Sequence, residues 1–372
     1  MYHFFPDNYW WTIRINGIIN EGYLGGGSYG EIVQVIERLN TKEPASWPRE
    51  WERLGEKVEG FARLSEADGI QTLARDRYLR ASNYYQLGAL SMRHDDPRMI
   101  EVYKKSIKCF HRGIQSLSHI EKVKVPYEHS HLPGYFVNAS SKGEKCPVMV
   151  IVDGVHGTAE KMFFILGRAC PEYGLSALCL DGPGNGGSIL LNGLHSRYDS
   201  EAQAKAVFDF LETRSDVDTR RVALISPSLG GYYAARAVAF EKRYAACVVY
   251  GAVYDYGEIW AGRPDDHEFA PLLMWILGVD NMAAAREKVS HYHLRGVAEL
   301  IECPTLILQG ENDRQVSMSH ANRLFEALRC SKKLRIFTKE DGGDEHCQQD
   351  NLEVMKEEVL SWITSTFLLK SS

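Results

Sequence analysis

Beyond residue 118 the chain alternates between short apolar runs and stretches of helical periodicity, and this alternation constrains the fold more than any other feature. The apolar runs are PVMVIVDG, LSALCLDG, RVALIS, AACVVYG, PTLILQG and KLRIFTK. The helical stretches cover residues 159–169, 201–214, 229–241, 317–329 and 351–367. Continuously apolar strands that alternate with helices are buried on both faces, so the pattern predicts a mostly parallel sheet flanked by helices.

Two further segments complete the prediction for this α/β domain, residues 118–372. The runs EKVKVPYE and LPGYFVNAS have the pattern of a hairpin, which predicts an antiparallel edge for the sheet. Residues 256–300 are long for a connection and contain the apolar piece APLLMWILG. We therefore expect residues 256–300 to form a lid segment.

The first 117 residues follow a different period. From about Tyr29 to Leu117, apolar residues recur three and four positions apart, as they do in amphipathic helices. Helix-breaking residues interrupt this pattern at Pro48, at Asp68-Gly69 and in the run HDDP. No 34-residue self-similarity is present, which argues against a tetratricopeptide array. We predict an N-terminal all-helical cap domain, residues 1–117.

The net charge and the cysteines indicate which binding partners and which cellular compartment to expect. A net charge of −6 argues against a nucleic-acid or anionic-membrane surface, and no apolar stretch approaches the roughly 20 residues that span a bilayer. Eight cysteines without a Cys-x-x-Cys pair indicate buried thiols in a reducing, cytoplasmic compartment, with no metal site. The aromatic segment Met1–Trp11 does not resemble a signal peptide. It predicts docking on its own core or on a second copy in a homodimer.

The first chemical motif follows the run RVALI. Ligands of open parallel sheets bind beyond the carboxyl ends of the strands, so the residues after each strand are the first candidates for a site. RVALI leads into SPSLGG (226–231) and then into helical YYAARAVAF, the strand–turn–helix context of a nucleophile elbow. The usual pattern, Gly-x-Ser-x-Gly, has glycine where Ser226 stands. We predict Ser228 as the nucleophile and the Leu229 N–H as an oxyanion donor.

Two later strand ends supply partners for this serine. PTLILQGENDRQVS places Asp313 just past one strand, and KEDGGDEHCQQD places His346 just past the last one. Ser, Asp, His is the chain order of α/β-hydrolase triads, in which histidine accepts the serine proton and aspartate orients the imidazole. Asp341 and Asp344 are rival partners, but both lie in the loop of His346 itself. Because that position makes the approach to Nδ1 harder, we prefer Asp313.

Five further residues are candidates for contact with substrate or oxyanion. The second oxyanion donor is expected from Val155 or its neighbour His156, in the run VDGVHGTAEKM. His156 itself either contacts substrate or caps this loop. Glu258 follows a strand end and either contacts substrate or is a solvated carboxylate. Tyr84 and Tyr85 either line an aromatic pocket or pack in the helical core.

Several segments resemble one group of α/β-hydrolases, which includes 2,6-dihydroxypseudooxynicotine hydrolase and the fungal pigment-pathway hydrolases that shorten a polyketide chain. The segments are FFPDNYWW, GGGSYGEI, DGVHGTAEKMF, LDGPGNGGS, SPSLGGYYAARAVAF, QGENDRQV and GDEHCQ. The resemblance implies a helical N-terminal domain before an α/β-hydrolase core, and a triad at Ser228, Asp313 and His346. It also implies cleavage of carbon–carbon bonds beside a ketone, or of related acyl bonds, without a cofactor.

These observations predict a cofactor-independent serine hydrolase. We expect it to cleave a β-diketone or a polyketide acyl chain through an acyl-enzyme, with a small aromatic or polyketide molecule as substrate. The same site also fits an enzyme that releases or cyclises a polyketide, or one that hydrolyses an ester or thioester. A non-catalytic scaffold with a degenerate core is the third alternative, which Ser226 favours and the presence of Asp313 and His346 opposes.

Overall fold

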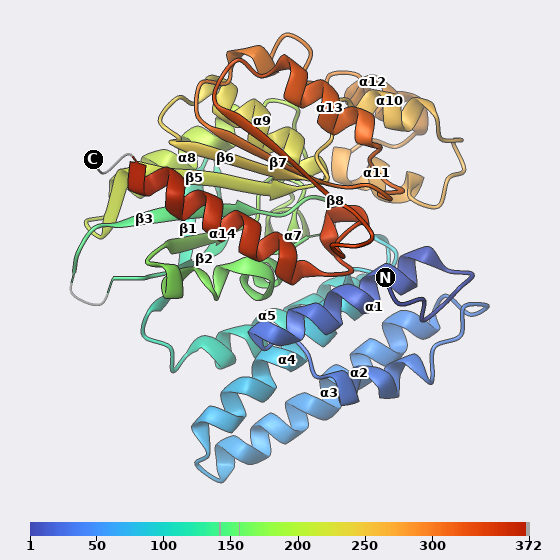
Figure 1. Cartoon of the computed structure of the whole chain (residues 1–372). Coiled ribbons are helices and arrows are strands. Elements are labelled where there is room, and N and C mark those ends of the chain that lie inside the picture. The colour runs from blue at the N-terminus through green and yellow to red at the C-terminus, as the bar shows by residue number, and fades with distance from the viewer. Residues whose placement is uncertain (141–142, 156, 370–372) are drawn as a thin grey trace. The chain divides into compact units, whose positions relative to one another are not determined.

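The computed structural model describes residues 1–140, 143–155 and 157–369, so the candidate His156 lies outside the described residues. The chain divides into two compact units, Met1–Ile120 and Glu121–Ser372 (Figure 1). In the described part of the chain, no helix combines the length and the apolar character needed to cross a membrane.

The first unit is helical, and its helices follow one another along the chain (Figure 1). They are α1 (Tyr9–Glu21), α2 (Tyr29–Ile36), α3 (Ser46–Ala67), α4 (Gln71–Ala89) and α5 (Pro97–Ile114). Aromatic rings form a continuous chain in its core: Trp47 lies 5.7 Å from Trp51, and Trp51 lies 5.8 Å from Tyr84, measured between ring centroids. Stacked and tilted aromatic pairs of this kind add to the stability that burial alone supplies.

Helix α1 lies before Tyr29, where the helical pattern of the sequence begins, although it falls within the predicted helical domain. Asn8 caps it by accepting a hydrogen bond from the Trp11 N–H at 3.0 Å, and the Trp11 ring lies 5.1 Å from that of Trp47. The aromatic N-terminal segment therefore docks on its own unit. The buried residues of α1 do not form a single stripe. Consecutive positions are buried in its centre, namely Ile15, Asn16, Gly17 and Ile18. The sequence of this helix therefore lacks a one-sided apolar pattern.

Helix α3 packs closely against α4 at Gly55. A Cβ atom at this position would lie 2.7–2.9 Å from carbon atoms of the Tyr85 ring. The ring has little freedom to move, because Tyr85 is buried and its hydroxyl donates to Glu59 Oε2 at 2.7 Å. Gly60, in the same helix, has open space where a Cβ would be.

We expect the two glycines of α3 to respond to alanine in opposite directions. Gly55→Ala forces the side chain against the Tyr85 ring and should lower the free energy of unfolding by about 1–3 kcal/mol. Gly60→Ala adds helix propensity without a clash and should raise it by about 0.5–1 kcal/mol. Thermal unfolding of the full chain measures both, and a stabilised Gly55→Ala variant would contradict the packing described here.

The second unit is built on a sheet. Its described residues form eight strands in the order β1-β2-β4-β3-β5-β6-β7-β8. Strands β3 to β8 pair in parallel, and β2 pairs antiparallel with β4, which confirms the expected α/β-hydrolase fold with an antiparallel edge. The strands are β1 (Ile120–Tyr127), β2 (Ser130–Val137), β3 (Cys146–Val152), β4 (Ser176–Leu180), β5 (Val217–Pro227), β6 (Ala246–Tyr250), β7 (Thr305–Gly310) and β8 (Lys332–Phe337).

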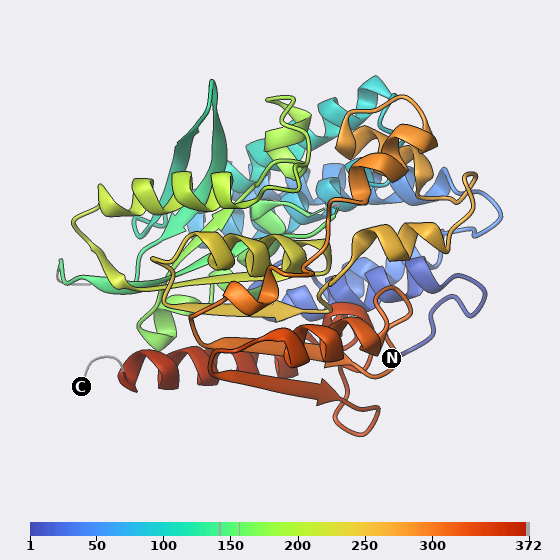
Figure 2. The ribbon, with the colours of Figure 1, turned by 90° about the horizontal axis from the view of Figure 1, so that it is seen from above.

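Helices cover both faces of this sheet. Helices α8, α9 and α13 lie on one face, seen from above in Figure 2, and α14 lies on the other. The expected lid segment contains α10, α11 and α12. The helices of this unit are α6 (Ala159–Met162), α7 (Gly186–Leu190), α8 (Glu201–Glu212), α9 (Leu229–Phe240), α10 (Tyr256–Ala261), α11 (Ala270–Leu277), α12 (Met282–Val289), α13 (Met318–Ala327) and α14 (Leu352–Leu369).

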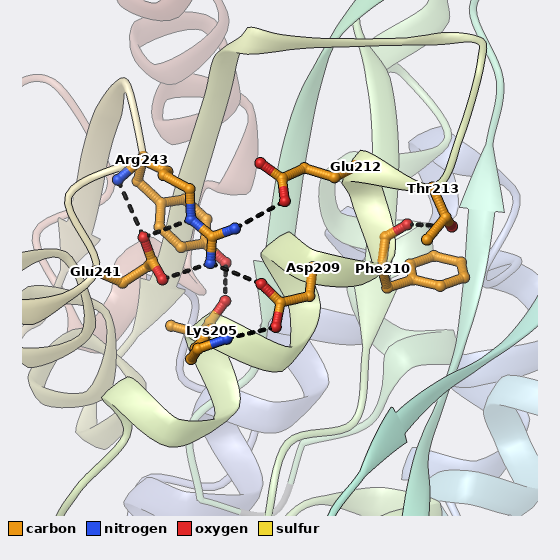
Figure 3. A network of polar contacts seen from close by, with 9 residues as sticks. Lys205, Asp209, Phe210, Glu212, Thr213, Glu241 and Arg243 are labelled. Carbon is orange, nitrogen blue, oxygen red and sulfur yellow. Dashed lines mark hydrogen bonds and ion pairs between the residues drawn. The ribbon is translucent and has the colours of Figure 1, made fainter.

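An ion-pair network joins α8 to the turn after α9 (Figure 3). The Arg243 guanidinium contacts the carboxylates of Asp209 at 2.8 Å, Glu212 at 2.9 Å and Glu241 at 2.7 Å, and it lies over the Phe208 ring. Because the carboxylates on α8 are half exposed, each pair adds little to stability by itself. We assign the network a structural role in holding α8 beside the helix that starts at the elbow.

Candidate active site

The turn between β5 and α9 has the geometry of a nucleophile elbow. Ser228 has φ 55° and ψ −125°, which is a strained conformation for a residue with a side chain. Three backbone hydrogen bonds hold it there: the Ser228 N–H donates to Tyr250 O at 2.8 Å, and Ser228 O accepts from Gly231 N and Val253 N. The strain is maintained because β6 and α9 both restrain the same residue, and it turns the Ser228 side chain away from the helix.

Ser226 fits the elbow although glycine is usual at its position. Its buried hydroxyl donates a hydrogen bond of 2.5 Å to the carbonyl oxygen of Val152, the last residue of the neighbouring strand β3. The hydroxyl also occupies the space beside Gly230, where a Cβ would overlap Ser226 Oγ. The serine is accommodated because β3 satisfies its hydroxyl and a glycine faces it.

His346 connects the two other strand-end residues. Its Nε2 lies 3.1 Å from Ser228 Oγ, and its Nδ1 lies 2.7 Å from Asp313 Oδ2. With the proton on Nδ1, the imidazole donates to the carboxylate and accepts from the serine hydroxyl. The His346 and Asp313 side chains are only 8% and 1% exposed, so both contacts are shielded from water. The structure thus places Ser228, His346 and Asp313 in one hydrogen-bonded chain.

The Asp313 carboxylate is itself fixed on both oxygens. Oδ1 accepts from the backbone N–H groups of Gln315 at 2.8 Å and Val316 at 2.9 Å, and Oδ2 accepts from Gln309 Nε2 at 3.2 Å as well as facing His346. These donors hold the carboxylate in place and set its direction.

The two rival aspartates have other partners in the structure. Asp341 accepts from the Thr338 N–H and from Arg335, and these contacts lower the pKa of Asp341 to about 2. Asp344 accepts from Asn312 Nδ2 at 2.6 Å. Of the three aspartates, Asp313 is the one whose carboxylate contacts His346 in the described part of the chain.

Two opposing effects act on His346. Burial disfavours the charged imidazolium, but the adjacent Asp313 carboxylate, with a further contribution from Cys347, raises the pKa of His346 well above its ordinary value. The site therefore stabilises an imidazolium that would form when His346 takes a proton from Ser228.

The two expected oxyanion donors come from the elbow itself and from the loop that follows β3. Leu229 is the first residue of α9, and Val155 follows β3. Within the described residues, neither of these backbone N–H groups has a hydrogen-bond acceptor. The loop and the elbow are in close contact, because a Cβ on Gly154 would lie 3.2 Å from Ser228 Cβ. Backbone N–H groups without an acceptor are able to bind an oxyanion.

The remaining sequence candidates make contacts elsewhere. Glu258, on α10, is exposed and forms an ion pair with Arg323, which lowers the pKa of Glu258. Tyr84 and Tyr85 are buried in the helical unit, where the Tyr84 hydroxyl donates to Glu31 and the Tyr85 hydroxyl to Glu59. The contacts described for these three residues do not include Ser228, Asp313 or His346.

Two residues close to the site were not singled out from the sequence. Asp153 is the first residue after β3 and is buried. Cys347 is buried too, and its Sγ lies 3.4 Å from His346 Nε2, the atom that also faces Ser228. Asp153 directly follows an apolar strand, and this position is the sequence signal that points to it. Cys347 carried no signal beyond its adjacency to His346.

Comparison with known proteins finds similar sequences among the α/β-hydrolases. The sequence profile of the Prolyl oligopeptidase family matches residues 194–368. The Alpha/beta hydrolase xenA of Xenoacremonium sinensis is 32% identical over 255 residues, which cover 66% of this chain and 60% of that protein. The chain has the α/β-hydrolase fold and is similar in sequence to this α/β-hydrolase. It spans less than two thirds of the length of that relative.

Two further relatives match the hydrolase along most of both chains. The 20-hydroxy-prefusarin hydrolase FUS2 of Gibberella moniliformis is 27% identical and is covered to 93%, as is this chain. The crystal structure of 2,6-dihydroxy-pseudo-oxynicotine hydrolase matches with a TM-score of 0.80 at 22% identity, over 94% of this chain and 95% of that one. At this identity the structural match supports the fold.

Proposed function

We propose that this hydrolase cleaves a carbon–carbon bond beside a ketone, in a β-diketone or polyketide acyl chain, through an acyl-enzyme at Ser228. The observation that carries the proposal is the hydrogen-bonded chain from Ser228 Oγ through His346 to Asp313. Relatives named for hydrolysis of 20-hydroxy-prefusarin and of 2,6-dihydroxy-pseudo-oxynicotine support a small-molecule substrate.

In the proposed first step, Ser228 Oγ attacks a substrate carbonyl carbon while His346 Nε2 takes the hydroxyl proton. The negative charge that forms on the carbonyl oxygen is stabilised by the N–H groups of Leu229 and Val155. Asp313 holds the imidazole tautomer and stabilises the imidazolium.

Collapse of the tetrahedral intermediate then breaks the bond to the α-carbon. The electron pair passes to an enolate, and the imidazolium of His346 protonates the α-carbon, which releases a ketone. Water attacks the remaining acyl-enzyme with His346 as base and releases a carboxylic acid. Each of these steps uses groups of the protein and water alone.

The test is analysis of the products from two compounds, 1-phenylbutane-1,3-dione and an N-acetylcysteamine thioester, in water enriched in oxygen-18. We expect loss of the diketone, with one acid and one ketone formed in equal amounts and a single heavy oxygen in the acid. The Ser228→Ala variant serves as the control. Release of free thiol with the diketone left intact would instead support thioester hydrolysis. If the acyl group of the thioester carries a hydroxyl, formation of an internal ester without heavy oxygen would support cyclisation.

A further inference from the structure

Asp153 carries a buried carboxyl group with an unfilled hydrogen-bonding position. The residue is 6% exposed, and its Oδ1 accepts from the Gly154 N–H at 2.7 Å. Its Oδ2 is buried and has no hydrogen-bond partner among the described residues. The Lys161 ammonium is 3.9 Å from this oxygen, too far for a hydrogen bond. Because buried polar atoms nearly always have a partner, Oδ2 is a candidate for contact with a ligand.

The backbone of Asp153 lies beside the elbow. The backbone carbonyl oxygen of Asp153 would be 3.0 Å from a Cβ on Gly230, and a Cβ on the next residue, Gly154, would be 3.2 Å from Ser228 Cβ. The carboxyl group also interacts electrostatically with His346 and Cys347. Asp153 therefore belongs to the same buried region as the imidazole and the serine hydroxyl.

The protonation of this carboxyl group depends on its surroundings. Burial raises the pKa of Asp153, and the Lys161 ammonium, the Gly154 N–H and His346 oppose that rise without cancelling it. The net direction is toward the neutral acid, and this protonated form is the one that has an O–H group to donate.

We propose that Asp153 is a further catalytic residue, whose neutral carboxyl donates a hydrogen bond from Oδ2 to the second carbonyl oxygen of a β-dicarbonyl substrate. This inference rests on the proposed function and names the substrate feature that the site selects. When the carbon–carbon bond breaks, its electron pair forms the α-carbon double bond and the former carbonyl oxygen becomes the enolate oxygen. The Asp153 hydrogen bond stabilises that oxygen, while the proton that the α-carbon needs comes from His346.

An ester has no such oxygen, so the role of Asp153 is separable from that of Ser228. We compare Asp153→Leu and Asp153→Asn on 1-phenylbutane-1,3-dione and on p-nitrophenyl acetate. In Asp153→Leu, kcat/KM for the diketone should fall at least 100-fold and that for the ester less than threefold. Asp153→Asn keeps an N–H donor and should stay within tenfold on the diketone. An equal fall in kcat/KM for the diketone and for the ester would contradict the inference and indicate that Asp153 only supports the structure of its loop.

Binding provides a readout that does not depend on carbon–carbon cleavage. In a Ser228→Ala background, calorimetry compares the diketone with 1-phenylbutan-1-one, which lacks the second oxygen. We expect about tenfold tighter binding of the diketone, lost in Asp153→Leu and kept in Glu160→Gln. Glu160 is a matched control because it is also buried with one unpartnered oxygen, Oε2, while the interactions described for it include the Tyr135 hydroxyl and not His346.

The two sets of measurements distinguish the inference from the function on which it rests. One outcome is a protein that binds the diketone in preference to the monoketone through Asp153 and yet cleaves no diketone. That result would overturn the proposed function and support the Asp153 contact. The Asp153 inference would be overturned if the Ser228→Ala parent bound the diketone no more tightly than 1-phenylbutan-1-one. It would also be overturned if the tighter binding of the diketone persisted in Asp153→Leu. Unfolding curves of each variant confirm that the compared proteins are folded.

Discussion

The Ser228→Ala variant is expected to lose ester hydrolysis almost completely, with kcat lower by roughly a factor of a million. The expectation follows from the elbow geometry, since the Ser228 hydroxyl is the group that His346 Nε2 contacts at 3.1 Å. The measurement is the initial rate of p-nitrophenyl butyrate hydrolysis. The free N–H groups of Leu229 and Val155 remain, so a small rate above that in water should persist.

Labelling with a fluorophosphonate identifies the same atom independently. We expect one adduct, on Ser228, that disappears in the Ser228→Ala variant and in His346→Ala. Ser226→Gly is the matched control, because the Ser226 hydroxyl is buried and already donates to Val152 O. That variant should still be labelled. An adduct mapped to Ser226, or one that survives in Ser228→Ala, would contradict the assignment of the nucleophile.

Replacing Asp313 with asparagine is expected to lower kcat by about 10⁴ and to shift the pH profile. The base in the reaction is neutral His346, so activity increases as pH rises through the pKa of that imidazole. The native carboxylate holds this pKa well above its ordinary value. In Asp313→Asn burial acts without the opposing charge and lowers the pKa, so the ascending limb should move to lower pH.

Asp341→Asn provides the control for this prediction. Asp341 lies in the same loop as His346, but its carboxylate contacts Thr338 and Arg335 at the surface. Its removal should leave both kcat and the ascending limb where they are. A pH profile that shifts in Asp341→Asn and stays in place in Asp313→Asn would show that Asp313 is not the aspartate that acts on the imidazole.

The fold was largely predictable because its signals are local. Runs such as PVMVIVDG and PTLILQG are long enough and apolar enough to predict strands buried on both faces, which β3 and β7 are. Helix α1 was missed for the opposite reason. Several consecutive residues in its centre are buried, so its sequence lacks a one-sided apolar stripe. The burial of this helix depends on its packing against the rest of the helical unit, which the periodicity does not show.

The sequence alone determined the residue types and their order: a serine at a strand–turn–helix junction, then an aspartate and a histidine after later strands. Only the tertiary structure decided which atoms meet. It brings Asp313, from the loop after β7, against His346, from the segment between β8 and α14, and it turns the Ser226 hydroxyl toward β3. It also buries the Asp153 carboxyl beside the elbow. Periodicity and turn chemistry are local properties of the chain, whereas contacts between strand ends depend on the order of strands in the sheet and on the loops that follow them.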